Sequence, residues 1–327
     1  MKKFINDVDS VMRESLAGLV EAHPGLMRVE FEPTFVARAE RASKKVAILS
    51  GGGSGHEPLH AGFVGRGMLD AACPGQVFTS PTPDQMLAAA AAAESGRGVL
   101  FIVKNYAGDT MNFQIASEML DLENATVLVN DDVAIENSKH TTGRRGVAGT
   151  LMVEKMVGAA AEAGAKLMEC KDLGDRVNAA TASMGVAFTS CTVPAAGRTT
   201  FDIGDDEMEV GVGIHGEPGR RREKVKPAGL IVDDLVGAIL ADLKPQSGRE
   251  VLLHVNGFGG TPLMELYLLY HNAAERLRAQ GLKPVRSLVG NYTTAIEMAG
   301  ASITVTMLDD EMKSLWDAPV HTAALHW

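Results

Sequence analysis

A glycine-rich segment that ends in a histidine is the first place in this sequence where chemistry can be expected. Residues 51–58 read Gly-Gly-Gly-Ser-Gly-His-Glu-Pro and follow the short apolar run at 45–50. Such a run is typical of a strand buried on both faces of a parallel sheet. The glycines leave backbone N–H groups open to a small polar ligand, with His56 at the rim. A tight strand-to-helix connection without any ligand is the alternative interpretation.

The same segment departs from four known templates. A Walker loop needs a Lys-Ser/Thr pair where His56 and Glu57 stand, so this nucleotide site is absent from the segment. The dinucleotide fingerprint and the nucleophile elbow each lack a required glycine. Residues 56–60 do spell HExxH, but Pro58 is tolerated only in the first turn of a helix. His56 and His60 are therefore not expected side by side on a helix as zinc requires, and we predict no metal site.

Two more polar side chains follow the apolar run at 99–103. Lys104 comes directly after the run, and Asp109 lies five residues further on. A carboxylate at the carboxyl end of a strand can act as a general base toward a substrate hydroxyl, and a lysine can orient that substrate. Asp109 could equally cap the helix expected at 111–122, and residue type alone does not decide between the two roles.

His215 lies in a segment interrupted by glycines at 213, 216 and 219. A neutral imidazole nitrogen in such a setting is a competent nucleophile for a carbonyl carbon. Taken alone, a histidine in a glycine-rich loop is more often structural than catalytic. The spacing also does not show that this loop meets the segment at 51–58, so the role of His215 stays open at this point.

Alternating strands and helices must position these residues in the first half of the chain. Strands are expected at 45–50, 99–103 and 126–129, and helices at 7–20, 85–94 with Asp84 as its cap, 111–122 and 147–163. This order predicts βαβ units and a mostly parallel sheet. Ligands bind such sheets at the carboxyl ends of the strands, where His56, Lys104 and Asp109 stand.

The second half has a different pattern. Residues 183–215 read as short strands with one solvated side, and a basic, exposed loop around residues 220–226 follows as a candidate contact for a partner. Helices at 231–243 and 263–280 and strands at 251–256, 285–289 and 302–308 then complete an α/β pattern. We expect two α/β domains, the first (1–185) with a mostly parallel sheet flanked by helices and the second (186–327) with a mixed sheet and helices. The tail at about 310–327 is expected to pack back on the first domain.

Composition narrows the class of protein further. The net charge of −10 argues against nucleic-acid and anionic-membrane binding. No apolar run is long enough to span a membrane, and the N-terminal residues turn acidic before a signal peptide could form. The three cysteines are widely spaced and are expected to be reduced thiols. We expect a cytoplasmic protein.

Longer strings in this sequence resemble the K subunit of the dihydroxyacetone kinases from end to end. Besides residues 51–58, they include Cys73-Pro74-Gly75, Phe78-Thr79-Ser80-Pro81-Thr82-Pro83-Asp84, Lys104-Asn105-Tyr106, Gly143-Arg144-Arg145-Gly146, Cys191-Thr192-Val193-Pro194, residues 211–219 and Trp316-Asp317-Ala318-Pro319.

The resemblance implies a role for each candidate residue. His215 would form a hemiaminal with the ketone carbon of the substrate. His56 and Asp109 would act on the hydroxyl that is phosphorylated. Gly53, Ser54, Gly55 and Lys104 match positions that hydrogen-bond the ketose. Ala107 stands where a hydroxyl residue is common in the family.

The resemblance also implies partners. This chain would bind no cofactor itself, and a separate L-type subunit would carry Mg-ATP, or Mg-ADP that a phosphocarrier protein recharges. A homodimer is expected. The family includes kinases for four-carbon ketoses such as erythrulose and ligand-sensing coactivators of transcription, so both remain alternatives to a dihydroxyacetone kinase subunit.

Overall fold

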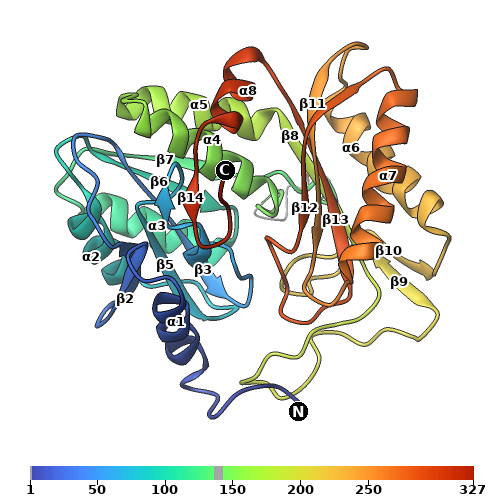
Figure 1. Cartoon of the computed structure of the whole chain (residues 1–327). Helices are drawn as coiled ribbons and strands as arrows, with labels where there is room; N and C mark the ends of the chain where they lie inside the picture. Colours follow the sequence, from blue (N-terminus) through green and yellow to red (C-terminus); the bar gives the residue numbers. More distant parts are fainter. Residues whose placement is uncertain (1, 136–142) are drawn as a thin grey trace.

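The computed structural model describes residues 2–135 and 143–327, which form two six-stranded sheets with helices around them (Figure 1). The first sheet has the strand order β1-β2-β5-β3-β6-β7. Its central strands run parallel, and the first two strands form an antiparallel edge. The strands are β1 (Met27–Phe31), β2 (Thr34–Arg38), β3 (Ala47–Ser54), β5 (Ala71–Val77), β6 (Val99–Lys104) and β7 (Asn124–Val129).

Helices cover both faces of this sheet. Along β3, Leu49 packs on the side of α2 (Pro83–Ala93) and α3 (Ala107–Met119), whereas Ile48 packs on the side of α4 (Gly149–Glu162) and α5 (Leu167–Ala179). Both side chains are fully buried. The sequence predicts this arrangement, because an uninterrupted apolar run is expected where both faces of a strand are covered.

The second sheet is mostly antiparallel, with the strand order β10-β9-β8-β13-β11-β12. Only β11 and β12 pair in parallel among the described strands of this sheet. The strands are β8 (Thr181–Ala187), β9 (Glu207–Val210), β10 (Arg221–Lys224), β11 (Glu250–Gly257), β12 (Lys283–Gly290) and β13 (Gly300–Met307). Two α/β units with one mostly parallel and one mixed sheet confirm the predicted fold class.

The two faces of the second sheet differ in polarity. Apolar side chains of β8, β11 and β13 pack against α6 (Ala228–Leu243) and α7 (Leu263–Ala279). On the other face, Ser183 and Thr304 share a hydrogen bond of 2.7 Å and are completely buried. The prediction of a solvated side was therefore wrong for β8. This face is polar, but it is covered, and α4 contacts both β8 and β13.

The last segment of the chain returns to the first sheet's side. After β13, helix α8 (Asp310–Asp317) packs against α4. Strand β14 (His321–Thr322) then pairs with β4 (Gly65–Arg66), which follows the short 3-10 helix η1 (Ala61–Phe63). Helix α1 (Val11–Ala22) lies at the opposite end of the chain, near β1.

Three local predictions were wrong. β3 does not end before the glycines but continues through them to Ser54. Helix α2 begins two residues earlier than expected, with Thr82 rather than Asp84 at its N-cap, because Pro83 is suited to a first helical position. The basic segment near residue 221 is not a loop but the edge strand β10, and Arg222 there pairs with Glu209.

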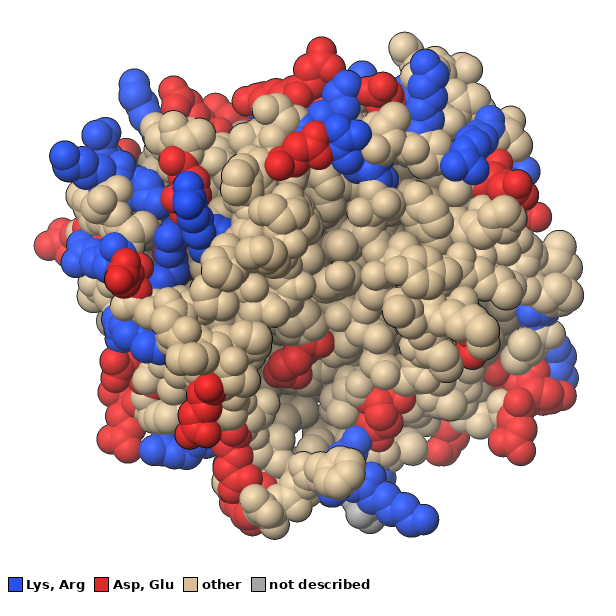
Figure 2. Space-filling view, in the orientation of Figure 1, with Lys and Arg blue, Asp and Glu red and all other residues tan. Residues whose placement is uncertain are grey.

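The surface and the cysteines add two observations. Figure 2 shows acidic and basic side chains interspersed around the rim of one face, while the centre of that face is largely uncharged. All three cysteines are buried and free. Within residues 2–135 and 143–327, no helix is long and apolar enough to cross a membrane.

Candidate functional site

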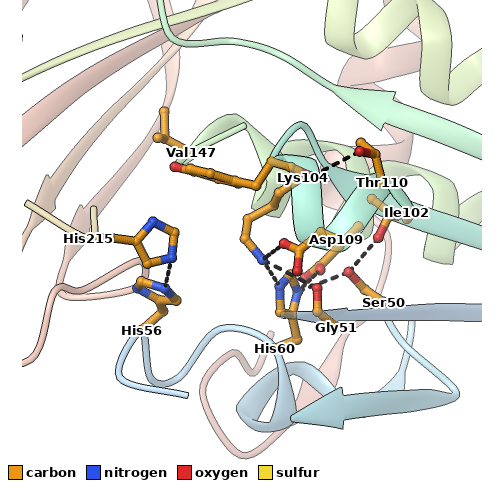
Figure 3. Close-up of polar contacts among 12 residues, drawn as sticks. Ser50, Gly51, His56, His60, Ile102, Lys104, Asp109, Thr110, Val147 and His215 are labelled. Carbon is orange, nitrogen blue, oxygen red and sulfur yellow. Dashed lines mark hydrogen bonds and ion pairs between the residues drawn. The ribbon is translucent and has the colours of Figure 1, made fainter. Parts of the chain in front are cut away.

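Four predicted residues from distant parts of the chain meet between the two sheets (Figure 3). His56 follows β3, Lys104 ends β6, and Asp109 lies in the first turn of α3. His215 comes from the loop between β9 and β10 of the second sheet. The first three therefore stand at the carboxyl ends of parallel strands, as predicted. Asp109 does not cap α3, because the N-cap is Tyr106.

The two histidines face each other through their Nε2 atoms, which are 3.0 Å apart. His56 Nδ1 donates to the carbonyl oxygen of Thr294 over 2.7 Å, because a carbonyl can only accept. Burial, together with the charges of His215 and Lys104, lowers the pKa of His56 well below its usual value. His56 is completely buried and stacks on Phe78.

His215 has a carboxylate partner that the sequence did not single out. Its Nδ1 lies 2.9 Å from Glu217 Oε1, and its backbone N–H donates to Glu217 Oε2. Burial alone would raise the pKa of Glu217, but the hydrogen bond and charge of His215, with the charge of Arg145, lower it to about 2. Glu217 is thus a carboxylate near neutral pH and keeps the proton of His215 on Nδ1.

The hydrogen atoms on the rings of His56 and His215 can be counted from the partners of each nitrogen. Both Nδ1 atoms carry hydrogens, since one faces a carbonyl and the other a carboxylate. Two neutral rings would then present two lone pairs to each other across 3.0 Å. A hydrogen bond between the two Nε2 atoms therefore requires one additional proton on the pair. The Glu217 carboxylate beside His215 would balance the charge of that proton.

Lys104 and Asp109 form a second group beside this pair. Lys104 Nζ lies 3.5 Å from Asp109 Oδ2 and 3.3 Å from the carbonyl oxygen of Gly51. Both side chains are almost fully buried. The other carboxylate oxygen, Asp109 Oδ1, is buried and has no hydrogen-bond partner among the described residues. It is therefore free to accept a hydrogen bond from a ligand.

The glycine-rich segment makes this close arrangement possible. A Cβ atom at Gly52 would lie 2.1 Å from Lys104 Nζ, so only glycine leaves room for the ammonium group. Gly55 has φ +102°, which favours glycine. Gly53 packs against Phe78, and the hydroxyl of Ser54 donates to the carbonyl oxygen of Gly75 over 2.7 Å. The side chain of Ser54 is thus already engaged within the protein.

The HExxH string does not build a zinc site. Residues 56–60 form turns rather than a helix. The two imidazoles point to different partners, His56 to His215 and His60 to Glu154. In the part of the chain that the structure describes, no three His, Cys, Asp or Glu side chains are grouped closely enough to hold a metal ion.

Sequence reasoning missed Glu217, Tyr106 and the partners of His60. Tyr106 places its ring edge-on to His215, with centroids 4.7 Å apart. A signal existed for Glu217, which stands two residues after His215 in the same glycine-interrupted loop. None existed for Glu154, which lies 94 residues from His60 and reaches it only through the fold.

Comparisons with known proteins agree on one family. The family model described as the Dak1 domain matches residues 17–324. The dihydroxyacetone-binding subunit DhaK of the PEP-dependent dihydroxyacetone kinase of Escherichia coli strain K12 is 47% identical over 355 residues, which covers 100% of this chain and 99% of that protein. The L-erythrulose 1-kinase of Mycolicibacterium smegmatis is 40% identical, and the alignment covers 99% of this chain but 58% of that protein.

A solved structure gives the same result. The dihydroxyacetone kinase operon co-activator Dha-DhaQ superposes with a TM-score of 0.91 at 32% identity, with 98% of both chains covered. The match of the family model, the identity along the whole chain and the shared fold lead to one conclusion: this chain belongs to the Dak1 domain family.

Proposed function

We propose that this chain binds a small ketose, dihydroxyacetone in the first place, and holds it covalently on His215 while one of its hydroxyls is phosphorylated. The observation that carries this proposal is the meeting of the two Nε2 atoms, 3.0 Å apart, beside Lys104 and Asp109. The name of the Escherichia coli relative, a dihydroxyacetone-binding subunit, supports the choice of ligand.

The covalent step uses the proton that the histidine pair shares. Nε2 of His215 attacks the carbonyl carbon, a C–N bond forms and the C=O double bond becomes a single bond. The developing alkoxide takes the shared proton from His56, which returns to the neutral form that its lowered pKa favours. The result is a hemiaminal, with the positive charge on the substituted ring of His215 and Glu217 as its counterion. Glycerol has no carbonyl and cannot form this bond.

Phosphorylation then needs a base for the substrate hydroxyl. Asp109 fills this role, because its Oδ1 atom is buried and unengaged by other described residues. Lys104 holds the carboxylate from the other side. Backbone groups of Gly53 and Ser54 bind the remaining hydroxyls, since the side chain of Ser54 donates to Gly75 and the N–H of Gly55 donates to Glu57. His56, neutral after the covalent step, supports the same hydroxyl.

The phosphoryl donor comes from a partner. We propose an L-type subunit that carries the nucleotide with Mg²⁺, used either as ATP or as ADP recharged by a phosphocarrier protein. This chain binds no cofactor of its own in this scheme. The erythrulose kinase relative is longer than this chain, which is compatible with a donor module on the same polypeptide there. We further propose a homodimer that acts in the cytoplasm.

The test is native mass spectrometry with dihydroxyacetone on the wild-type protein and on His215→Ala. We expect one adduct per chain in the wild type and none in the variant. His271→Ala is the matched control, because that histidine is exposed on α7, and its adduct should persist. Adduct formation that survives His215→Ala would reject the covalent role. An adduct with erythrulose alone would keep the mechanism and change the substrate.

A ligand-sensing coactivator is the second candidate, favoured by the similarity to the co-activator Dha-DhaQ. Both candidates form the hemiaminal. Only the kinase subunit yields a phosphorylated ketose when a cognate L-type subunit and Mg-ATP, or the phosphocarrier system, are added. Product formation in that mixture identifies the kinase subunit, and an adduct without product under both donor conditions identifies the coactivator.

A further inference from the structure

A chain of buried polar side chains leads from the ketose site into the core, and the mechanism above does not use its inner members. Lys104 Nζ lies 2.8 Å from His60 Nε2 (Figure 3). On the other side of the ring, His60 Nδ1 lies 2.6 Å from Glu154 Oε1. The three side chains come from β6, from the loop after β3 and from α4, and all are at least 97% buried. Replacing buried charged groups by well-packed apolar side chains is often neutral or stabilising in proteins, so packing alone does not explain them.

The hydrogen atoms in this chain can be counted. The Ser50 hydroxyl lies within hydrogen-bond distance of His60 Nδ1 and of the carbonyl oxygen of Ile102, and it also hydrogen-bonds Glu154, so its one hydrogen is not part of the contact between His60 and Glu154. The contact between His60 and Glu154 therefore uses a hydrogen from one of those two groups. Glu154 Oε2 is buried without a hydrogen-bond partner among the described residues, so Oε1 is the favoured place for a proton on this carboxyl.

Two arrangements satisfy both contacts of the His60 ring. In the first, Lys104 is an ammonium that donates to Nε2, and Nδ1–H donates to an ionised Glu154. In the second, Glu154 is protonated and donates to Nδ1, while Nε2–H donates to a neutral Lys104 amine. The two arrangements hold the same number of protons. They interconvert when one proton moves from Lys104 to Nε2 and another from Nδ1 to Glu154.

We propose that His60 and Glu154 are positioning residues that set the charge of Lys104 beside Asp109. The His60 ring takes a proton from Lys104 at Nε2 and passes a proton from Nδ1 to Glu154. This inference rests on the proposed function, since it assigns Asp109 the role of base. An ammonium 3.5 Å from Asp109 stabilises the carboxylate and weakens it as a base, whereas a neutral amine leaves it stronger.

The electrostatics of the core agree with both arrangements. Burial raises the pKa of Glu154 to about 8, against smaller opposing effects of Ser50 and Lys104, so a protonated carboxyl is accessible near neutral pH. Burial and the charges of Lys104 and His56 lower the pKa of His60 well below its usual value. The ring therefore stays neutral and passes protons rather than storing them.

The ionisable groups that face this chain are few in the described parts of the protein. They are His56 from the loop after β3, Lys104 from β6, Asp109 from α3 and Glu154 from α4, together with His60 itself. His56 is the only one of them that contacts the second sheet's side, through His215. A change at Glu154 therefore reaches the site by way of His60 and Lys104.

The first test does not depend on enzyme activity. Nitrogen-15 NMR of histidine-labelled protein reports which ring nitrogen of His60 carries hydrogen, and a His60→Gln variant assigns the signals. In the wild type we expect averaged shifts of Nδ1–H and Nε2–H, and in Glu154→Gln the pure Nδ1–H form, because an amide cannot take up the Nδ1 proton when Lys104 would release one to Nε2. A wild-type His60 that is already pure Nδ1–H would overturn the inference, whatever the fate of the proposed function.

The second test measures the pH profile of phosphoryl transfer with an L-type subunit. Glu154→Gln fixes Lys104 as an ammonium, so the acid limb of kcat/KM should move to lower pH by about 1 unit and the plateau should fall roughly tenfold. Adduct formation with dihydroxyacetone should not change. Glu154→Asp keeps a titratable group and should restore part of the shift.

Thr150→Val is the matched control for these variants. Thr150 lies one turn earlier on α4, is fully buried, and has a hydroxyl without a partner in the described residues. Its replacement removes a buried polar group from the same helix without touching the chain, so the acid limb should stay in place. Equal profiles for the wild type and Glu154→Gln, or an equal shift in Thr150→Val, would contradict the inference.

Discussion

The protein contains two histidine–carboxylate pairs that are built alike and behave in opposite ways. In both, Nδ1 of the ring faces a glutamate oxygen, at 2.9 Å for His215 and Glu217 and at 2.6 Å for His60 and Glu154. The first pair is partly open, with side chains 21% and 33% exposed, whereas the second is 3% and 0% exposed. The pKa of Glu217 is lowered to about 2, and that of Glu154 is raised to about 8.

The balance between burial and neighbouring groups differs between the two carboxyls. For Glu217, the hydrogen bond and charge of His215, with the charge of Arg145, outweigh the effect of burial on the pKa. For Glu154, the effects of Ser50 and Lys104 are smaller than that of burial, so burial dominates. Glu217 is therefore ionised near neutral pH, whereas a proton on Glu154 is accessible there.

The largest expected effect concerns the pH dependence of stability. The pKa of Glu154 is raised from 4.5 to about 8 by burial, so its contribution to stability is complete below pH 4.5 and is lost as pH rises through 8. Glu154→Gln should remove this loss, which is on the order of 1 kcal/mol for each pH unit between these limits. Urea unfolding at pH 5, 6.5 and 8 measures it.

Glu217→Gln is the control for that experiment. The folded pKa of Glu217 lies at about 2, below the ordinary 4.5, so its contribution is present above pH 4.5 and is lost only in strong acid. The slope between pH 5 and 8 should thus equal that of the wild type. If Glu154→Gln also kept the wild-type slope, the contrast between the two pairs would be refuted.

The next effect concerns ketose binding. Glu217→Gln keeps a hydrogen-bond acceptor for His215 but removes the charge that balances the cationic ring. A hydrogen bond to a charged group contributes about 1.5–3 kcal/mol, so affinity for dihydroxyacetone should fall roughly 10- to 100-fold. Calorimetric titration measures this change. Glu223→Gln, on the nearby edge strand β10, should bind as the wild type does. Affinity within threefold of the wild type in Glu217→Gln would show that the charge is not needed.

The smallest effect belongs to ion pairs at the surface. Arg221 pairs with Asp234 over 2.8 Å, and both side chains are more than a third exposed. Such pairs contribute at most about 1 kcal/mol. Arg221→Ala should therefore lower the free energy of unfolding by less than this and leave coupled kinase activity unchanged. A loss of activity at constant stability would instead assign β10 to the docking of a partner.

The elements with a clear pattern of apolar residues could be predicted from the sequence. The buried strands β3 and β6 were evident because apolar residues run through them without interruption, and the site was expected at their carboxyl ends. The polar face of β8 was misjudged, because alternation shows that one side is polar but not what covers it. Helix α4, which covers it, is close only in space.

The residues of the candidate site could be predicted from the sequence, but the contacts between them could not. His56, Lys104, Asp109 and His215 were candidates from residue type and from family resemblance. Their meeting required the second sheet to place residue 215 against the first, which no spacing reveals. Glu154 was hidden because a glutamate in a mostly apolar helix gives no sign of its partner, and only the packing of α4 on β3 and β6 brings it to His60.

The pairing of β14 with β4 has a mechanical consequence. The polypeptide passes from the first sheet to the second after α5 and returns after β13, and the segment after β7 also reaches the second sheet, where Asp132 bridges to Ser183. The two sheets are therefore joined by more than one covalent connection rather than by a single hinge. A large rotation of one sheet away from the other would first have to break the pairing of residues 321 and 322 with residues 66 and 65. We therefore expect the contact between His56 and His215 to loosen only slightly unless the pairing of β14 with β4 is broken.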